Sequence, residues 1–290
     1  MGEIHDALRR ADLSTDGSVA SDRSKGHRTD PEILEAFRSL APERTRAERE
    51  AEPQITLSED KHGRWQSREV IVDARGPAAE SLRHLALRLR RELQARGVRS
   101  VALLSALRAE GKTTLACNLA LALASLDTGR GVALVDLDLR KPQVAQSFEI
   151  RGGAGIEAVL AGRIGLRDAC TSIASPPLDV YPALRTEQDA HLVLSQPSLG
   201  PLVRQLEREY EIVVVDTPPV LLVPDALIIL EAVKSAVIVG RARRSTGGAV
   251  EAMRKMIPKE RLIGAVLNEG ALPVRAGHYG YYDEELPEEA

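Results

Sequence analysis

Aromatic residues are scarce in this chain of 290 residues, where Phe, Trp and Tyr together make up 3%. Three of the five tyrosines fall within four positions near the C-terminus: Tyr279, Tyr281 and Tyr282. A hydrophobic core is hard to build around rings spaced so closely along the chain. We therefore expect these three tyrosines to serve a purpose other than packing.

Cysteine is nearly absent as well. The two cysteines, Cys117 and Cys170, lie far apart in the sequence, and neither has a CxxC pattern or a Cys/His cluster near it. This spacing argues against a disulfide framework and against a zinc site. It is typical of reduced thiols in a cytosolic protein, and we expect no zinc.

Neither charge sign dominates, and long hydrophobic runs are missing. The chain has 39 Lys and Arg against 42 Asp and Glu, for a net charge of −3, so no global basic field points to a nucleic-acid partner. The most apolar stretch, residues 212–233, is interrupted by two aspartates and three prolines, and the first residues are charged. We therefore expect a cytoplasmic protein without a membrane-spanning helix or a signal peptide.

The chain changes in character along its length. Residues 1–66 have few apolar side chains among many charged and small ones, which predicts a largely disordered N-terminal segment. We expect a folded domain over residues 67–270 and a flexible tail over residues 271–290. The folded part opens with a short strand at residues 70–72 and a helix over residues 78–96, which Gly97 ends.

Short β-branched runs then alternate with segments long enough for helices. The predicted strands are residues 101–105, 132–135, 212–215, 236–239 and 262–267. Their runs are apolar on both faces, which is typical of parallel strands covered by helices on both sides. The sequence therefore predicts the α/β class, with a doubly wound, mostly parallel sheet.

A phosphate-binding loop follows the first of these strands. Residues 105–114 read SALRAEGKTT, which is a Walker A pattern with Ala106 in place of the first Gly, and a helical run over residues 115–126 comes next. In such a loop the backbone N–H groups point at phosphate oxygens, Lys112 neutralises the β/γ charge and the Thr113 hydroxyl binds Mg²⁺. The candidate nucleotide-binding residues here are Ala109, Glu110, Gly111, Lys112, Thr113 and Thr114.

Three carboxylates stand at the ends of two further strands. Asp136 and Asp138 follow the run at 132–135, and their spacing of two turns them to the same side of the sheet. Asp216 follows the run at 212–215. This is the position of a Walker B acid, which holds Mg²⁺ directly or through water. A single strand-end Asp more often caps a turn, but a sheet that also carries a P-loop favours metal binding. The candidate metal ligands are Thr113, Asp136 and Asp216.

The three motifs together resemble those of a known family. SALRAEGKTT, VALVDLDLRKP and VVVDTPPVLLVPDA have the order and spacing of the Walker A, A′ and B motifs of the bacterial tyrosine kinases of capsule and exopolysaccharide loci, over about residues 70–271. The resemblance implies a P-loop fold and ATP-dependent protein-tyrosine autokinase activity, with ATP and Mg²⁺ as cofactors. It implies phosphate and metal binding by Lys112 and Thr113, metal binding by Asp216, positions beside the acceptor hydroxyl for Asp136 and Asp138, and adenine contact by Asn268.

The chemistry of phosphoryl transfer to tyrosine agrees with these implied roles. The resemblance also implies partner proteins. A tyrosine hydroxyl is largely protonated at neutral pH, so a nearby carboxylate is needed to take its proton. The candidate catalytic residues are Lys112, Asp136 and Asp138. The implied phosphoacceptors are Tyr279, Tyr281 and Tyr282, phosphorylated by a neighbouring protomer of a homo-oligomer. A membrane polysaccharide co-polymerase is the implied activator, which would recruit the kinase to the inner face of the membrane.

The chain also departs from the family pattern. Ala86 takes the third position of the oligomerisation motif Glu-x-x-Arg-x-x-Arg, and Arg108-Ala109 stand where the family loop commonly has Pro-Gly. Ala109 restricts the backbone where Gly would bend freely. These departures keep open a second function, a nucleotide-dependent assembly switch that does not transfer phosphate.

Two further alternatives rest on single features. A positioning ATPase of the MinD/ParA type shares the fold, but Leu107 stands where those proteins usually carry a signature Lys. The basic residues of 241–244 resemble a small nucleic-acid patch, although so short a run is typical of a solvated edge. We therefore predict a solvated edge at 241–244.

Overall fold

The computed structural model describes residues 56–57, 77–126, 129–173, 176–185 and 189–270. The predicted strand at 70–72, the tyrosine tail at 271–290 and, apart from residues 56–57, the N-terminal segment lie outside the described residues.

The described strands form one sheet in the order β1-β8-β7-β2-β6-β3-β5-β4. All neighbouring pairs are parallel except β4 and β5, which are antiparallel at one edge. The strands are β1 (Thr56–Leu57), β2 (Ser100–Ser105), β3 (Val132–Asp136), β4 (Thr171–Ile173), β5 (Leu178–Tyr181), β6 (Ile212–Asp216), β7 (Ala236–Arg241) and β8 (Leu262–Asn268). The mostly parallel sheet predicted from the sequence is confirmed.

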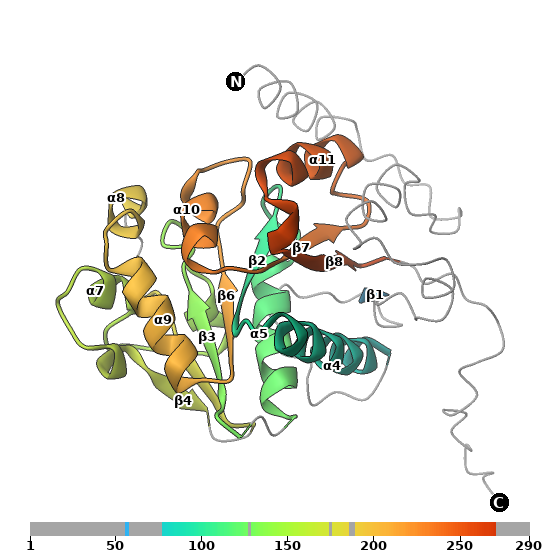
Figure 1. The fold of residues 1–290 in the computed structure, drawn as a ribbon. Helices are drawn as coiled ribbons and strands as arrows, with labels where there is room; N and C mark the ends of the chain where they lie inside the picture. The colour runs from blue at the N-terminus through green and yellow to red at the C-terminus, as the bar shows by residue number, and fades with distance from the viewer. Residues whose placement is uncertain (1–55, 58–76, 127–128, 174–175, 186–188, 271–290) are drawn as a thin grey trace, which may run out of the picture.

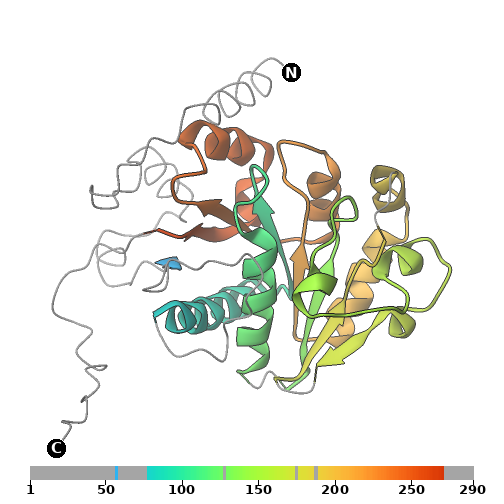
Figure 2. The ribbon, with the colours of Figure 1, turned by 180° about the vertical axis from the view of Figure 1, so that it is seen from behind.

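Helices cover both faces of this sheet (Figures 1 and 2). The α-helices are α4 (Pro77–Arg96), α5 (Lys112–Ala124), α6 (Val144–Ser147), α7 (Ile156–Leu160), α8 (Ala190–Leu194), α9 (Leu199–Glu209), α10 (Asp225–Ala232) and α11 (Gly247–Met256), and η1 (Leu166–Ala169) and η2 (Lys259–Arg261) are 3₁₀ helices. No described helix combines the length and the apolar character needed to span a membrane.

Two hydrophobic cores lie on opposite sides of the sheet, because side chains of a strand alternate between its faces. In β2, Ala102 and Leu104 join the core under α7, α8, α9, α10 and α11, whereas Val101 and Leu103 join the core under α4, α5 and α6. Figure 1 shows α4 crossing α5. Since α4 and the sheet enclose α5, nearly every side chain of α5 is buried.

The five strands predicted from β-branched runs are confirmed as β2, β3, β6, β7 and β8, and the helix predicted at 78–96 is α4. The P-loop helix begins at Lys112, three residues before the predicted start, because the loop closes directly onto it. Three strands were missed. β1 has two residues, in the segment that the sequence predicted to be largely disordered. β4 has three residues and β5 has four, and β4 is only partly buried, so none of the three carries the long apolar run that identified the others.

The order of the strands fixes where chemistry can occur. β2 lies between β6 and β7, and β3 lies on the other side of β6. Asp136 and Asp216 are register partners at the ends of β3 and β6. The carboxyl ends of parallel strands meet at one edge of a sheet, where such folds bind their ligands.

Candidate active site

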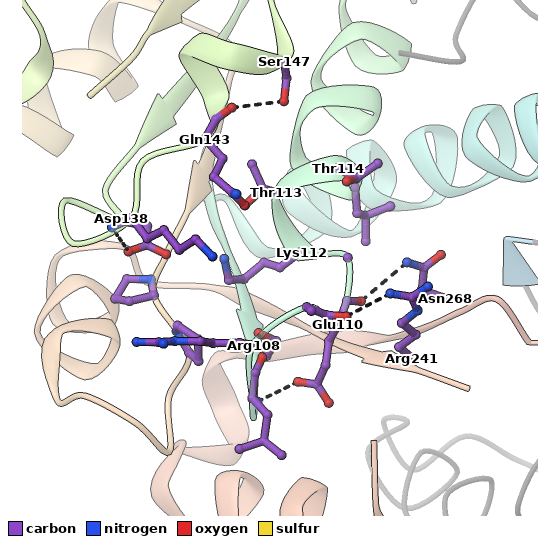
Figure 3. Close-up of a pocket in the computed structure, with 18 of the residues that line it drawn as sticks. Arg108, Glu110, Lys112, Thr113, Thr114, Asp138, Gln143, Ser147, Arg241 and Asn268 are labelled. Atoms are coloured by element: carbon purple, nitrogen blue, oxygen red, sulfur yellow. Dashed lines mark hydrogen bonds between the residues drawn. The ribbon is translucent and has the colours of Figure 1, made fainter. Parts of the chain in front are cut away.

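One pocket lies at the carboxyl edge of the sheet, around the loop that joins β2 to α5. The loops after β3 and β6 and the last residues of β7 and β8 complete its wall. Figure 3 shows Asp138 at one end of this pocket and Asn268 at the other, with Lys112 between them. The pocket therefore joins residues from all three sequence motifs and from the last strand.

The P-loop backbone turns through two left-handed residues before α5. Gly111, the residue at the N-cap of α5, has φ of 84°, and a Cβ atom built on it would come within 2.0 Å of Asn268 Nδ2. The backbone conformation therefore favours glycine at this position, and any side chain here would displace the Asn268 amide. Ala109 has φ of 60°, which costs energy for a residue with a Cβ. The predicted restriction at Ala109 thus falls on a backbone angle that glycine would adopt freely.

Lys112, Thr113 and Asp216 contact one another directly. The Lys112 ammonium lies 2.8 Å from Asp216 Oδ1, and the Thr113 hydroxyl donates to Asp216 Oδ2 at 2.6 Å. Asp216 is fully buried and Lys112 is 6% exposed. The P-loop cation, the P-loop hydroxyl and the strand-end acid are thereby assembled at one point, although 103 residues separate Thr113 from Asp216 in sequence.

Asp136 and Asp138 differ in what their carboxylates face. Asp136 is fully buried, outside the pocket lining, and accepts hydrogen bonds from the backbone N–H groups of Asp138, Gln143 and Val144. Asp138 lines the pocket and accepts from the Lys141 backbone N–H at 3.1 Å. Asp138 is therefore the only one of the two that a molecule in the pocket would meet at the described surface.

Burial shapes the electrostatics of this group. It raises the pKa of Asp136 well above its usual value, and the neighbouring Asp216 carboxylate adds to that rise. Burial also raises the pKa of Asp138, against the opposing charge of Lys112. For Lys112, burial alone would lower the pKa, but the surrounding carboxylates outweigh it and raise the pKa. Lys112 is thus charged at neutral pH, and Asp138 has the raised pKa that suits a proton acceptor.

Asn268 closes the other end of the pocket. Its Nδ2 atom lies 3.5 Å from the Glu110 carbonyl, which joins the end of β8 to the P-loop. Its Oδ1 atom is buried and has no hydrogen-bond partner in the described structure. A buried acceptor without a donor costs free energy, and the exocyclic amino group of adenine would supply that donor. The residues present therefore fit a purine nucleotide.

The side chain of Glu110 is engaged elsewhere. Its carboxylate accepts from the Leu107 N–H at 2.7 Å and from the Ser245 hydroxyl, and burial raises its pKa. Glu110 was predicted to bind the nucleotide, but its carboxylate is engaged within the protein, so only its backbone N–H is available to a phosphate. The side chain instead fixes the P-loop to the segment after β7.

The same segment carries two residues that the sequence did not reveal. Arg241 donates to the Ala109 carbonyl at 3.2 Å and to Glu269 at 2.7 Å, and Arg244 donates to the Arg108 carbonyl at 3.2 Å. The prediction of a solvated edge at 241–244 is confirmed for Arg243 and Arg244, which are exposed, but it missed the hydrogen bonds by which Arg241 and Arg244 hold the outer side of the P-loop. No local pattern announces such contacts, since 132 residues separate Arg241 from Ala109.

A second missed contact joins the two later motifs. Arg140, of the VALVDLDLRKP motif, donates to Asp225 Oδ2 at 2.6 Å, and Asp225 is fully buried at the first turn of α10. His191 Nδ1 lies 3.4 Å from the same carboxylate. Arg140 and Asp225 both lie inside motifs quoted from the sequence and carry opposite charges, and this was the signal from which their ion pair could have been predicted.

Comparisons with known proteins identify the family of this chain. No family model matches the chain. Tyrosine-protein kinase YwqD of Bacillus subtilis (strain 168) is 32% identical over 191 residues, which are 64% of this chain and 78% of that protein. A putative tyrosine-protein kinase in the cps region of Klebsiella pneumoniae is 28% identical over 172 residues, 59% of this chain and 23% of that protein.

Among solved structures, the kinase domain of Escherichia coli tyrosine kinase ETK superposes with a TM-score of 0.67 at 22% identity. The match covers 81% of this chain and 96% of that domain, and it shows that the fold is shared. YwqD carries the stronger evidence, because its identity exceeds 30% and most of its length is matched. The chain belongs to the family of bacterial tyrosine-protein kinases.

Proposed function

We propose that this kinase transfers the γ-phosphoryl group of ATP to tyrosines in the C-terminal tail of a second copy of the chain. The observation that carries the proposal is the direct contact of Lys112 and Thr113 with Asp216, beside a pocket that also presents Asp138. Phosphoryl transfer depends chiefly on positioning and charge stabilisation, and these are the groups that such a reaction requires.

The binding roles divide between the two ends of the pocket. Asn268 would accept from the adenine amino group, and the backbone N–H groups from Ala109 to Thr114 would donate to phosphate oxygens. Lys112 would neutralise the terminal phosphates, while Thr113 and Asp216 would hold Mg²⁺. Bound Mg²⁺ would supply further positive charge to the phosphates. Asp136 lies below the pocket floor, so we assign it to orienting the loop that bears Asp138 and to the outer metal environment.

Asp138 would act as the proton acceptor. It takes the proton from the tyrosine hydroxyl as the phenolic oxygen forms a bond to the γ-phosphorus and the bond to the β–γ bridging oxygen breaks. The products are phosphotyrosine and ADP, and Asp138 later returns its proton to water. Its place in the pocket lining supports this role over Asp136, which is buried outside that lining, and its raised pKa suits a proton acceptor.

Larger assignments rest on the family. We propose that residues 67–270 form the catalytic domain, to whose sheet β1 adds residues 56–57, that the rest of residues 1–66 is a separate segment, and that Tyr279, Tyr281 and Tyr282 are the acceptors. The relative in a cps region supports a role in capsule or exopolysaccharide synthesis or export. We further propose a homo-oligomer and a membrane co-polymerase that recruits the kinase to the inner face of the membrane. In α4, Ala86 is fully buried, so any oligomer contact there must use other positions such as Glu80 and Arg83.

Mixing an inactive acceptor chain with an active kinase chain that lacks the tail tyrosines tests the proposal. One chain carries Lys112→Met and keeps its tail, and the other keeps its P-loop but has Phe at positions 279, 281 and 282. With ATP and Mg²⁺, phosphotyrosine should appear on the Lys112→Met chain, as read by mass spectrometry. Because Lys112 is buried against Asp216, an Asp138→Asn chain serves as a second acceptor whose P-loop pair is intact. Absence of label on both acceptors, when each chain is folded, would refute transfer between copies.

A further inference from the structure

The pocket carries positive charge that its own carboxylates do not match. Five cationic side chains line it: Arg108, Lys112, Arg140, Lys141 and Arg241. Three of these have a carboxylate partner, respectively Asp216 for Lys112, Asp225 for Arg140 and Glu269 for Arg241. In the described part of the chain, the structure gives no ion pair to Arg108 or Lys141, and both are exposed. Two cations therefore remain available to an incoming anion.

Both of these cations flank Asp138. The Arg108 side chain extends toward the Asp138 end of the pocket (Figure 3). Burial raises the pKa of Asp138, and the charges of Lys112 and, more weakly, Arg108 oppose that rise. Lys141 follows Asp138 in the turn closed by its backbone hydrogen bond to that carboxylate, 3.1 Å long. Arg108 and Lys141 thus lie where a tyrosine hydroxyl must approach, away from the Asn268 end.

The tail has the complementary charge. Its tyrosines are followed directly by Asp283, Glu284 and Glu285. An extended chain advances about 3.3 Å per residue, so these carboxylates lie within about 10 Å of Tyr282 along the tail. An acidic segment entering a pocket that is lined by Asp138, with Asp136 and Asp216 buried behind that lining, needs nearby cations to be accepted. Arg108 stands where the family loop commonly has Pro, so this cation is a feature of this chain.

We propose, on the basis of the proposed autokinase function, that Arg108 and Lys141 form an acidic-peptide subsite that binds the carboxylates following the acceptor tyrosine. The subsite selects tyrosines with acidic residues on their C-terminal side and orients the tail with its hydroxyl toward Asp138. Arg108 is then a specificity-determining residue and acts on the acceptor, whereas Lys112 acts on the nucleotide.

A double-mutant cycle between two chains tests this proposal. The acceptor chain carries Lys112→Met and has either the native tail or a neutral tail, defined by Asp283→Asn, Glu284→Gln and Glu285→Gln. The kinase chain has either Arg108 or Arg108→Gln, and a matched control has Arg167→Gln, an exposed arginine outside the pocket. Every kinase chain also has the neutral tail with Phe at positions 279, 281 and 282, so that its own tail neither competes nor becomes labelled.

Initial rates of acceptor labelling give the answer. The kinase chain that keeps Arg108 and the Arg167→Gln kinase chain should label the native acceptor tail about three- to tenfold faster than the neutral acceptor tail. This is the range expected for one or two partly exposed charge pairs. With Arg108→Gln that preference should shrink toward one, and Lys141→Gln should remove the remainder. An equal preference in the Arg108 and Arg108→Gln kinases would overturn the subsite.

Two other outcomes are distinct from these. An equal loss of rate on both tails with a raised KM for ATP would assign Arg108 to the nucleotide and refute the proposal. The proposed function fails separately if no kinase chain labels either tail, because the cycle needs transfer between copies before any preference can be measured.

Discussion

Ala109 holds a left-handed backbone conformation in the P-loop, with φ of 60°. Replacing it by Gly removes about 1–2 kcal/mol of strain, while the freer unfolded chain returns about 0.5–1 kcal/mol. We therefore expect Ala109→Gly to raise the free energy of unfolding by about 0.5–1 kcal/mol, as measured by urea denaturation. Ala161, with φ of −77°, is the control, and Ala161→Gly should lower stability. Destabilisation by Ala109→Gly would show that the strain is absent.

Glu110 should make stability depend on pH. Burial raises the pKa of Glu110 in the folded protein, above its ordinary value of 4.5. The folded state therefore binds more protons than the unfolded state, and its stability falls as pH rises from about 4.5 through the folded pKa. Glu110→Gln cannot ionise, so its stability relative to the native chain should increase with pH. Thermal melts of both chains from pH 4 to pH 8 measure the difference. If the stability of Glu110→Gln minus that of the native chain stayed constant or fell as pH rises, the prediction would be contradicted.

Asp138 and Asp216 should fail in different ways. Asp138→Asn removes the proposed proton acceptor and should slow transfer by about 10²–10⁴-fold, with ATP affinity nearly unchanged. Asp216→Asn removes the carboxylate that holds Lys112 and Thr113, so it should weaken nucleotide binding in Mg²⁺. Calorimetry and single-turnover rates separate the two effects. The same loss of ATP affinity in both variants would contradict the assignment of different roles to Asp138 and Asp216.

The ion pair between Arg140 and Asp225 ties the loop after β3 to the start of α10. Asp225 is fully buried, whereas the Arg140 side chain is 35% exposed. Arg140→Met leaves a buried charge beside His191 alone and should cost about 3 kcal/mol of unfolding free energy. Asp225→Asn leaves an arginine that can reach water and should cost about 1 kcal/mol. Chemical denaturation measures the unfolding free energy of both variants. Equal losses in Arg140→Met and Asp225→Asn would show that the burial of Asp225 does not determine the cost of breaking the ion pair.

The elements best predicted from sequence were those with local signals. The runs that became β2, β3, β6, β7 and β8 are apolar and β-branched, and the P-loop residues are contiguous, so each could be read within a window of a few residues. The antiparallel edge of β4 and β5 carried too few residues for such a reading.

The missing parts of the site depend on distant contacts. Arg241 reaches the P-loop from the end of β7, and only the neighbouring placement of β7 and β2 makes that possible. The different surroundings of Asp136 and Asp138 likewise depend on how the loop after β3 folds back over its strand. The spacing of two residues predicted that both carboxylates lie on one side of the sheet. It did not predict that backbone N–H groups would donate hydrogen bonds to the Asp136 carboxylate.

The molecule as a whole should become more stable when a nucleotide binds, because the pocket wall draws on the ends of five strands. A ligand at about 100 times its Kd adds about 2.7 kcal/mol to the free energy of unfolding. We expect Mg²⁺ and ADP to raise the melting temperature, and Asn268→Ala to need more ADP for the same rise. Leu192→Ala is the control, since Leu192 is 64% exposed and outside the pocket lining. An unchanged dose dependence in Asn268→Ala would remove Asn268 from the nucleotide site.

The contact between Lys112 and Asp216 should make the binding of nucleotide and of metal depend on each other. A triphosphate that draws the ammonium away leaves a fully buried carboxylate with only the Thr113 hydroxyl, and an uncompensated buried charge costs several kcal/mol. A divalent cation restores the balance, so each ligand lowers the cost of admitting the other. We therefore expect nucleotide and Mg²⁺ to bind with positive cooperativity, because both must displace the internal ion pair between Lys112 and Asp216.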